Sequence, residues 1–324
     1  MRKKQRPYSM KLDGITYSLL TSWLTCRQQC RFQLEGWRSI RPKEAMSFGS
    51  LFHGMLHILY DHFRIGKTPT TMKGMLRSAR GRVKPWIASY VEQESRTTSS
   101  PDFISMLERH AAVCEAILPI YLTQWEDDFR SREWLNLESE FDVVHPGGTP
   151  YRLRGKRDGV FRKTGKRGVW LLETKTKSRI DSDLVDALAV DAQNLFYMWA
   201  TSLELGEMPI GVDYNVVRRP SIKQSASESA EEYAERAAVD MAARPETYFV
   251  RMEAAYDKAD VLRFAEELTR KLAEFKQWSE NPDKHTYRNE SSCLSRWACD
   301  YLSACASGTM GGYIQVRRFS ELAP

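Results

Sequence analysis

The sequence predicts an α/β protein in which helices flank a central mixed β-sheet. Residues 151–162 and 168–176 read as two strands joined by a turn rich in Gly and Lys, which indicates a β-hairpin. A helical segment follows over 181–205, and a strand is predicted over 211–217. A helix that crosses between two strands implies parallel pairing with a right-handed crossover, so hairpin and crossover together make a mixed sheet.

Length and composition are those of a folded protein. The chain has 324 residues, 42% of them hydrophobic, enough for one large or two modest domains with a real core. The formal net charge is +6, but residues 151–180 hold eleven Lys or Arg and two acids, so this segment carries +9 and the rest −3. We expect this segment to attract a polyanion, since solubility alone does not require segregated charge.

The sequence also predicts the compartment. The basic N-terminus leads into no apolar signal segment, and no run approaches the roughly 20 apolar residues of a membrane span. We therefore expect a cytoplasmic protein without a membrane association. In that reducing compartment the six cysteines are better explained as thiols or metal ligands than as disulfides.

The hairpin carries two acids that are expected to face each other. If it folds symmetrically about residues 165–166, Asp158 lies opposite Glu173, with Cβ atoms roughly 4.5–5.5 Å apart. Carboxylates that close repel unless a cation lies between them, and Mg²⁺ prefers oxygen ligands. Lys175 falls on the same face as Glu173 and can hold a water nucleophile or offset charge on a phosphate. The alternative is a solvated ribbon whose acids pair with Lys and Arg, at about 0–1 kcal/mol per pair.

Two helices are predicted ahead of the sheet. The first covers 16–37 and the second 45–63. The second contains Gly49 and, four residues later, His53, and the glycine would permit close backbone approach. His57 lies one turn beyond His53, as in a helical metal pair, although such histidines are usually structural and we assign His57 to that role.

A helical region is expected between these helices and the sheet. It covers 75–94 and 103–134, with a possible break at Pro119. Several basic side chains of its first helix either line a path for DNA or form a solvated helix face. These residues are Arg77, Arg80, Arg82 and Lys84. The strand predicted next, over 137–144, places Glu140 near the acids of the hairpin.

Further elements follow the hairpin. Gln193 and Tyr197 are one turn apart on the crossing helix, and on spacing alone they fit a packed helix face. The remaining chain predicts a helix over 231–243, a strand over 245–251 and a helix over 257–278.

A cysteine triplet lies near the C-terminus. Cys293, Cys299 and Cys305 fall within thirteen positions, in a segment too short and polar to form its own core. Three thiols leave a tetrahedral or cubane metal site one ligand short, which Cys26 could supply. Structural zinc and three free thiols are the alternatives. Cys30 and Cys114 are expected in the core.

In this order the motifs resemble the PD-(D/E)XK nuclease superfamily, and within it the RecB-type branch. The matching elements are Cys26, Gly49 with His53, Gly155-Lys156-Arg157-Asp158-Gly159 with Glu173-Thr174-Lys175, Gln193 with Tyr197, and the cysteine triplet. Arg157 stands where the nominal motif has Pro. Residues 245–251 are similar to segments of bacteriophage-type members. The joint order is more specific than any single element.

The resemblance implies a restriction-endonuclease-like core, with residues 1–324 as a single nuclease domain, 64–135 as a helical insertion, and 285–310 as a cysteine segment joined to Cys26. It implies catalysis by Asp158, Glu173 and Lys175, and Mg²⁺ or Mn²⁺ held by His53, Asp158 and Glu173. The DNA contacts that we assign are Gln193, Tyr197, Arg154, Lys156 and Lys177.

The iron-sulfur subgroup of RecB-type nucleases has one N-terminal and three C-terminal cysteines. By this resemblance, Cys26, Cys293, Cys299 and Cys305 hold a [4Fe-4S] cluster that pins the two ends of the chain together. The implied function is a metal-dependent DNA exonuclease of recombination, repair or phage DNA processing, with a helicase or recombinase partner. A non-catalytic DNA-binding or scaffold module is the alternative, and RNA stays open as a substrate.

Overall fold

The computed structural model describes residues 7–40, 44–96, 100–147, 151–188, 190–294, 298–319 and 322. The basic residues at positions 2–6, on which the expectation about the N-terminus depends, lie outside this part of the chain, as do 295–297 in the cysteine segment. Among the helices in these ranges, none combines the length and the hydrophobicity that a membrane-spanning segment requires.

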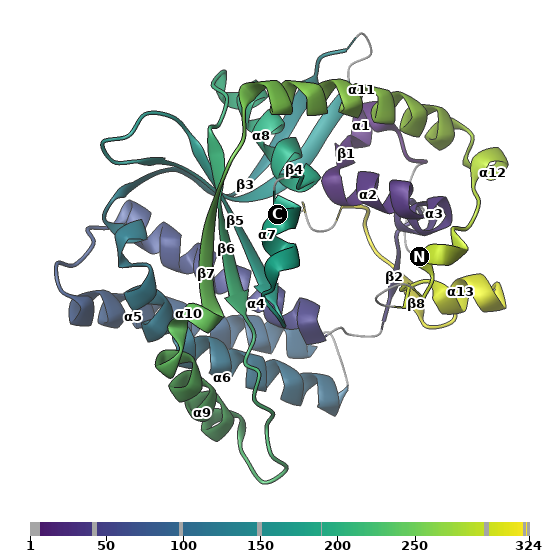
Figure 1. Ribbon diagram of the computed structural model, residues 1–324. Coiled ribbons are helices and arrows are strands. Elements are labelled where there is room, and N and C mark those ends of the chain that lie inside the picture. The colour runs from purple at the N-terminus through teal and green to yellow at the C-terminus, as the bar shows by residue number, and fades with distance from the viewer. Residues whose placement is uncertain are drawn as a thin grey trace.

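A mixed sheet of six strands forms the centre of the protein, as the sequence predicted (Figure 1). Its strands are β1 (Ile15–Thr16), β3 (Arg132–His145), β4 (Tyr151–Lys163), β5 (Trp170–Lys177), β6 (Gly211–Arg218) and β7 (Phe249–Ala255). The order is β1-β4-β5-β6-β7, with β3 also paired to β4. Pairing is parallel between β5 and β6, as the crossover implied, and antiparallel between β3 and β4, β4 and β5, and β6 and β7.

The register of the hairpin is the predicted one. Gly159 pairs with Leu172, and Phe161 pairs with Trp170, and the same register extended by one residue beyond this ladder places Asp158 opposite Glu173. Gly165 in the turn has φ 73°, a conformation that glycine adopts without steric cost. The turn chemistry therefore set the pairing that brings the two acids together.

Helices cover both faces of the sheet (Figure 1). On one face α4 (Glu44–Ile65) packs on β3 and β5, and α5 (Met72–Arg96), α6 (Pro101–Gln124) and α9 (Ala230–Ala243) lie beyond it. On the other face α8 (Ala192–Leu205) contacts β3 and β4, and α11 (Lys258–Glu280) packs against α8. Each face has its own apolar core, the first around Phe52, Tyr121 and Leu172 and the second around Phe196 and Leu268.

Short elements join the two ends of the chain. The three residues of β2 (Trp37–Ser39) pair antiparallel with β8 (Tyr313–Gln315). Beside them lie α2 (Tyr17–Thr25), α3 (Arg27–Leu34), α12 (Pro282–His285) and α13 (Leu302–Ser307). The remaining elements are α1 (Met10–Asp13), η1 (Glu126–Phe129), α7 (Ser182–Leu188), α10 (Pro245–Tyr248) and η2 (Glu290–Ser292).

Four predicted elements were wrong in detail. The helix expected over 16–37 is broken at Cys26, whose backbone is extended, and it ends before strand β2. The helix expected to reach residue 134 ends at Gln124, because strand β3 already begins at Arg132, and Pro119 does not interrupt it. The segment 181–205 forms two helices, and the second starts where the Asp191 side chain caps it. Residues 245–248 form a helical turn, and the strand begins only at Phe249.

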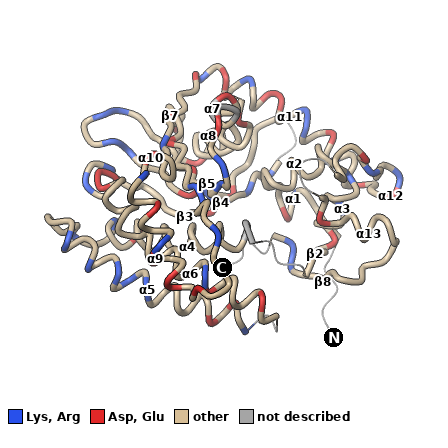
Figure 2. Tube along the Cα trace, turned by 60° about the horizontal axis from the view of Figure 1, so that its bottom comes forward, with Lys and Arg blue, Asp and Glu red and all other residues tan. Residues whose placement is uncertain are grey.

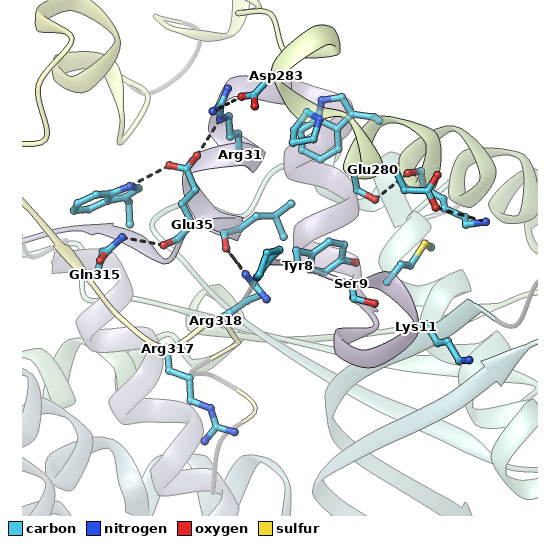
Figure 3. Close-up of a pocket in the computed structure, with 18 of the residues that line it drawn as sticks. Tyr8, Ser9, Lys11, Arg31, Glu35, Glu280, Asp283, Gln315, Arg317 and Arg318 are labelled. Carbon is cyan, nitrogen blue, oxygen red and sulfur yellow. Dashed lines mark hydrogen bonds and ion pairs between the residues drawn. The ribbon is translucent and has the colours of Figure 1, made fainter. Parts of the chain in front are cut away.

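A wide cavity of about 1410 Å³ lies between the two ends of the chain, away from the acids of the sheet (Figure 3). It is lined by residues of α1, α3, the end of α11 and the segment after β8. Its charged groups are largely paired with one another. Arg31 bonds Glu35 and Asp283, and Arg318 donates to the carbonyl of Leu34. The cavity therefore offers few unpaired groups for chemistry.

Candidate active site

A local distortion of the sheet brings two acids together. β3 pairs Leu137 with Gly159 and Ser139 with Arg157, so the ladder passes over Glu138 and Asp158. Glu138 has φ 45°, a left-handed backbone that is uncommon for a residue other than glycine and costs of order 1–3 kcal/mol. Strain of this kind gathers at functional sites, where the surrounding structure maintains it.

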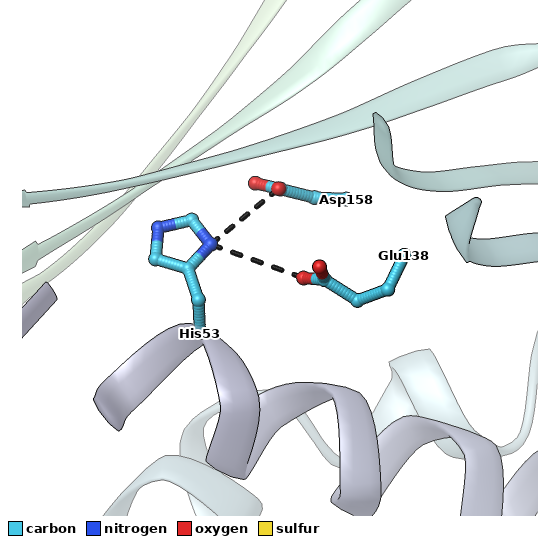
Figure 4. Close-up of side chains that lie close together, drawn as sticks. All are labelled: His53, Glu138 and Asp158. Carbon is cyan, nitrogen blue, oxygen red and sulfur yellow. Dashed lines mark ion pairs between the residues drawn. The ribbon is translucent and has the colours of Figure 1, made fainter. Parts of the chain in front are cut away.

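His53 reaches these acids from helix α4 (Figure 4). Its Nδ1 lies 3.4 Å from Asp158 Oδ1 and 3.9 Å from Glu138 Oε1. Gly49, one turn earlier, lets the helix approach β5 closely, since a methyl group there would lie only 3.2 Å from Thr176 Oγ1. Because Gly49 lets the helix lie close to the sheet, His53, one turn later, can reach Asp158 with its imidazole.

Asp158 is held in place by the neighbouring strand. Its Oδ2 accepts a hydrogen bond of 2.6 Å from the backbone N–H of Thr174. The Thr174 side chain in turn accepts a bond of 3.3 Å from Asn215 Nδ2 on β6. The carboxylate that faces His53 is thus fixed through two strands of the sheet.

Glu173 and Lys175 form the second half of the site. Lys175 Nζ donates to Glu173 Oε1, and it also lies 3.0 Å from Gln193 Oε1 on α8. Gln193 Nε2 donates to the same Glu173 oxygen at 3.0 Å. The Asp191 carboxylate accepts from the backbone N–H of Gln193 at 2.8 Å and so starts the helix at the point where this side chain faces the sheet.

The electrostatics of the site reflect an excess of buried negative charge. Burial, together with Asp158, raises the pKa of Glu173 to about 7, although Lys175 opposes the shift. Burial alone would lower the pKa of His53, but Asp158, Glu138 and Glu173 together raise it to about 9. Burial also lowers the pKa of Lys175, yet Glu173 outweighs it and keeps the ammonium charged.

The donor set suits a divalent cation. The ligand atoms of His53, Glu138 and Asp158 all lie within 4.8 Å of one another, and in the described ranges they form the sole such group of three or more His, Cys, Asp or Glu. A cavity of about 10 Å³, roughly the size of one water molecule, lies among them and is also lined by His57. Two carboxylates and an imidazole around so small a space fit a hard cation with oxygen ligands.

The sequence did not identify Glu138. It placed Glu140 near the acids, but Glu140 is exposed and Glu138 faces His53 instead. Regular strand alternation puts both on one face, so no signal in the sequence separates them. The predicted metal ligand Glu173 lies beside Asp158 but outside the closest group of three.

The residues assigned to DNA contact have different environments. Lys156 lies 2.7 Å from Glu138 and is 44% exposed. Arg154 is 3.3 Å from Asp142 and packs by the ring of Phe319, so it is engaged within the protein. Lys177 ends strand β5 beside Arg218 of β6. The ring of Tyr197 packs edge-on against Phe141.

The four cysteines assigned to a cluster lie near one another. Burial raises the pKa of Cys299, and the neighbouring Cys26 and Cys293 add to the shift. Burial likewise raises the pKa of Cys305, with contributions from Cys299, Cys26 and Cys293. The break between α2 and α3 orients Cys26 so that its sulfur accepts from the backbone N–H of Asn289 at 3.4 Å. Cys30 and Cys114 are buried in the core.

The centre of the mixed sheet presents three acids, a histidine and a lysine, a set of side chains that can hold a divalent cation beside a positively charged group. The family model described as "PD-(D/E)XK nuclease superfamily" matches residues 15–306. The chain belongs to this superfamily, which indicates a metal-dependent, hydrolytic nuclease.

Among solved structures, "Crystal structure of SSO0001" is 18% identical, covers 58% of this chain and 71% of that chain, and has a TM-score of 0.27. A search of curated proteins found no match.

Proposed function

We propose that the protein is a RecB-type nuclease that hydrolyses DNA phosphodiester bonds with Mg²⁺ or Mn²⁺. We further propose that it acts as an exonuclease in recombination, repair or phage DNA processing. The observation that carries this proposal is the convergence of His53, Glu138 and Asp158 on one small space, with Glu173 and Lys175 beside it. Such a nuclease commonly acts with a helicase or recombinase, and we expect a partner of that kind.

In this proposal His53, Asp158 and Glu173 hold the cation, and Glu138 adds a further carboxylate. A bound divalent cation lowers the pKa of a coordinated water and polarises the phosphate. Lys175 is fixed by Glu173 and Gln193 and keeps its charge, so it can orient the attacking water or offset charge on a phosphate oxygen. Gln193 and Tyr197 place the substrate strand, and Lys156 and Lys177 bind its phosphates. Arg154 is the weakest of the assigned contacts, because it is already paired with Asp142.

The experiment that tests the proposal uses end-labelled single- and double-stranded DNA. We expect the anaerobically purified protein to release label with Mg²⁺ or Mn²⁺ and not with excess chelator. Glu173→Ala protein, purified in parallel, controls for a contaminating nuclease. Firm DNA binding at low salt without cleavage by the wild type would instead favour a binding or scaffold module. Labelled RNA in the same assay decides whether DNA is the preferred substrate.

Glu138→Gln tests the additional carboxylate. The substitution keeps the size of the side chain but removes its charge, and we expect the concentration of Mn²⁺ that gives half-maximal cleavage to rise about 10- to 100-fold. A metal titration of cleavage, together with calorimetric binding of Mn²⁺, measures the effect. Glu140→Gln, on the same strand but exposed, is the matched control. An unchanged metal requirement in Glu138→Gln would exclude Glu138 from the metal site.

We also infer that Cys26, Cys293, Cys299 and Cys305 hold a [4Fe-4S] cluster. The proposal is supported by the mutual influence of the four thiols, since Cys26 and Cys293 add to the raised pKa of both Cys299 and Cys305. A cluster in which each iron takes one thiolate needs four cysteines that lie near one another.

Metal analysis tests this assignment. Anaerobically purified protein is expected to be brown, with about four iron and four sulfide per chain. Cys299→Ser should lose the visible absorption, and Cys114→Ser, which alters a core thiol, should keep it. A colourless protein loaded with zinc would refute the cluster.

We further infer that residues 1–324 form one nuclease domain, with 64–135 inserted and 285–310 joined to Cys26. Residues of α5 and α6 share one apolar core with sheet residues such as Leu172, which supports a single unit.

A further inference from the structure

Helix α5 carries a basic stripe on its outer face. The stripe consists of Lys73, Arg77, Arg80 and Lys84, which are spaced by four, three and four residues and therefore lie on one side of the helix. All four side chains are exposed. The opposite side of the helix is apolar and buried, so packing against α4 and α6 fixes which way the stripe faces.

The stripe is barely neutralised by the rest of the protein. Residues 64–84 contain seven Lys or Arg and no Asp or Glu. Lys84 lies 3.6 Å from Glu115. No acidic side chain in the part of the chain that the structure describes pairs with Lys73, Arg77 or Arg80. Lys and Arg follow one another along α5 in Figure 2.

A helix face that only keeps the protein soluble has a different charge pattern. Helix α11 is also amphipathic and nearly as long, with 23 residues against 25 in α5, and it contains five basic and five acidic residues. Several of these pair within the helix, such as Arg263 with Asp260 and Lys271 with Glu267. Mixed signs are expected of a solvated face, and the last part of α5 shows them, since Arg96 pairs there with Glu92. The single sign of the stripe over residues 73–84 is instead expected of a surface that binds a polyanion.

The position of α5 connects the stripe to the active site. Gly54, next to His53, faces Trp86, and a side chain at Gly54 would collide with its ring. Farther along the two helices, His62 bonds Ser78 at 2.7 Å. The helices therefore run antiparallel, so the Lys84 end of the stripe lies level with His53. The stripe extends from there for about 16 Å, at 1.5 Å per residue.

We propose that the α5 basic stripe is a second binding surface for the phosphate backbone of the substrate, outside the active site. That this polyanion is DNA rests on the proposed function. A length of about 16 Å matches roughly five nucleotides of a strand that rises 3.4 Å per nucleotide. Side chains one helical turn apart give regularly spaced positive charges without reading sequence, so the surface holds the substrate independently of sequence.

DNA affinity and its salt dependence test the proposal. The triple variant Lys73→Gln, Arg77→Gln and Arg80→Gln removes three charges and keeps residues of good helix propensity. Made in the Glu173→Ala background, which prevents cleavage, it is expected to bind fluorescent duplex about tenfold more weakly. The slope of log affinity against log salt should fall by about 2 to 3, since each lost phosphate contact contributes about 0.9.

The matched control is the triple variant Lys258→Gln, Arg263→Gln and Arg270→Gln, which removes three exposed charges from α11. We expect its affinity to stay within about twofold of the parent and its salt slope to be unchanged. Circular dichroism and thermal midpoints establish that both variants are folded.

The outcomes separate this inference from the proposed function. Selective loss of binding in the α5 variant supports the inference even if the wild type does not cleave DNA. Equal affinity of the α5 and α11 variants overturns it even if the wild type is an active nuclease. Absence of DNA binding by the wild type also overturns it, and retention of an acidic protein by the stripe would then be the explanation to pursue.

Discussion

Replacing Glu173 by alanine is expected to reduce the rate of DNA cleavage about a thousandfold or more. Glu173 is buried beside Asp158, and it accepts hydrogen bonds from both Lys175 and Gln193. Its removal takes away one carboxylate next to the cation site and leaves the part-buried ammonium of Lys175 without its nearest counter-charge. Single-turnover cleavage of labelled DNA at saturating Mn²⁺ measures the loss.

Two further variants separate chemistry from folding. Glu173→Gln keeps the shape of the side chain and should lose activity to a similar extent, because the charge is what the cation and Lys175 require. Glu140→Ala alters an exposed acid on β3, the strand that carries Glu138, and should retain full activity. DNA binding at low salt should survive in both Glu173 variants, since it depends on Lys and Arg. Cleavage within tenfold of the wild type in Glu173→Ala would place the reaction elsewhere.

The closeness of Asp158 to Glu173 could be predicted because short-range rules control the register of the hairpin. A turn of Gly and Lys determines the register, and strand alternation then determines which side chains share a face. His53 was assigned because Gly49 and His53 together resemble a motif of the family, and the close approach of Gly49 to Thr176 gives that spacing a physical reason. These relations involve residues close in sequence or directly across a hairpin.

Glu138 could not be predicted because its position depends on a departure from those rules. A regular strand would treat Glu138 and Glu140 alike. The left-handed backbone of Glu138 turns its side chain toward His53, and no residue type in the segment requires that conformation. The pairing of β2 with β8 was missed for a different reason, since strands of three residues some 270 positions apart leave no periodic pattern.

The segment 245–251 gains a physical explanation from the structure. Arg251 ends it, and its guanidinium donates to Asp128 Oδ1 at 2.6 Å. Asp128 also accepts from Tyr60 at 2.6 Å and lies 2.8 Å from Arg132 Nε. Arg251 further contacts Asn215 at 3.3 Å. A buried network of polar groups therefore leads from Asp128 through Arg251 to Asn215 on β6. Asn215 bonds the side chain of Thr174 on β5, and the N–H of Thr174 bonds Asp158.

Replacing Asp128 by alanine is expected to lower the free energy of unfolding by about 3–5 kcal/mol. The carboxylate is 3% exposed and is shared by two arginines that are each 9% exposed. Arg132 keeps Asp213 as a partner at 2.6 Å, but among the described residues Arg251 keeps Asn215 and the ring of Trp125 and no carboxylate. A buried guanidinium without a carboxylate is costly, and that cost dominates the effect. Urea unfolding followed by circular dichroism measures it.

The neighbouring acid gives the control. Asp127 is exposed, and Asp127→Ala should change stability by no more than about 0.5 kcal/mol. The double variant Asp128→Ala with Arg251→Met also removes the guanidinium that has lost its carboxylate. It should recover part of the lost free energy of unfolding, because replacing a buried ion by an apolar residue often lowers stability little. If the double variant were as unstable as the sum of its single variants, the two residues would act independently. The network would then stabilise the fold through packing alone. The hydrogen bonds that lead from it toward Asp158 would contribute nothing to the free energy of unfolding.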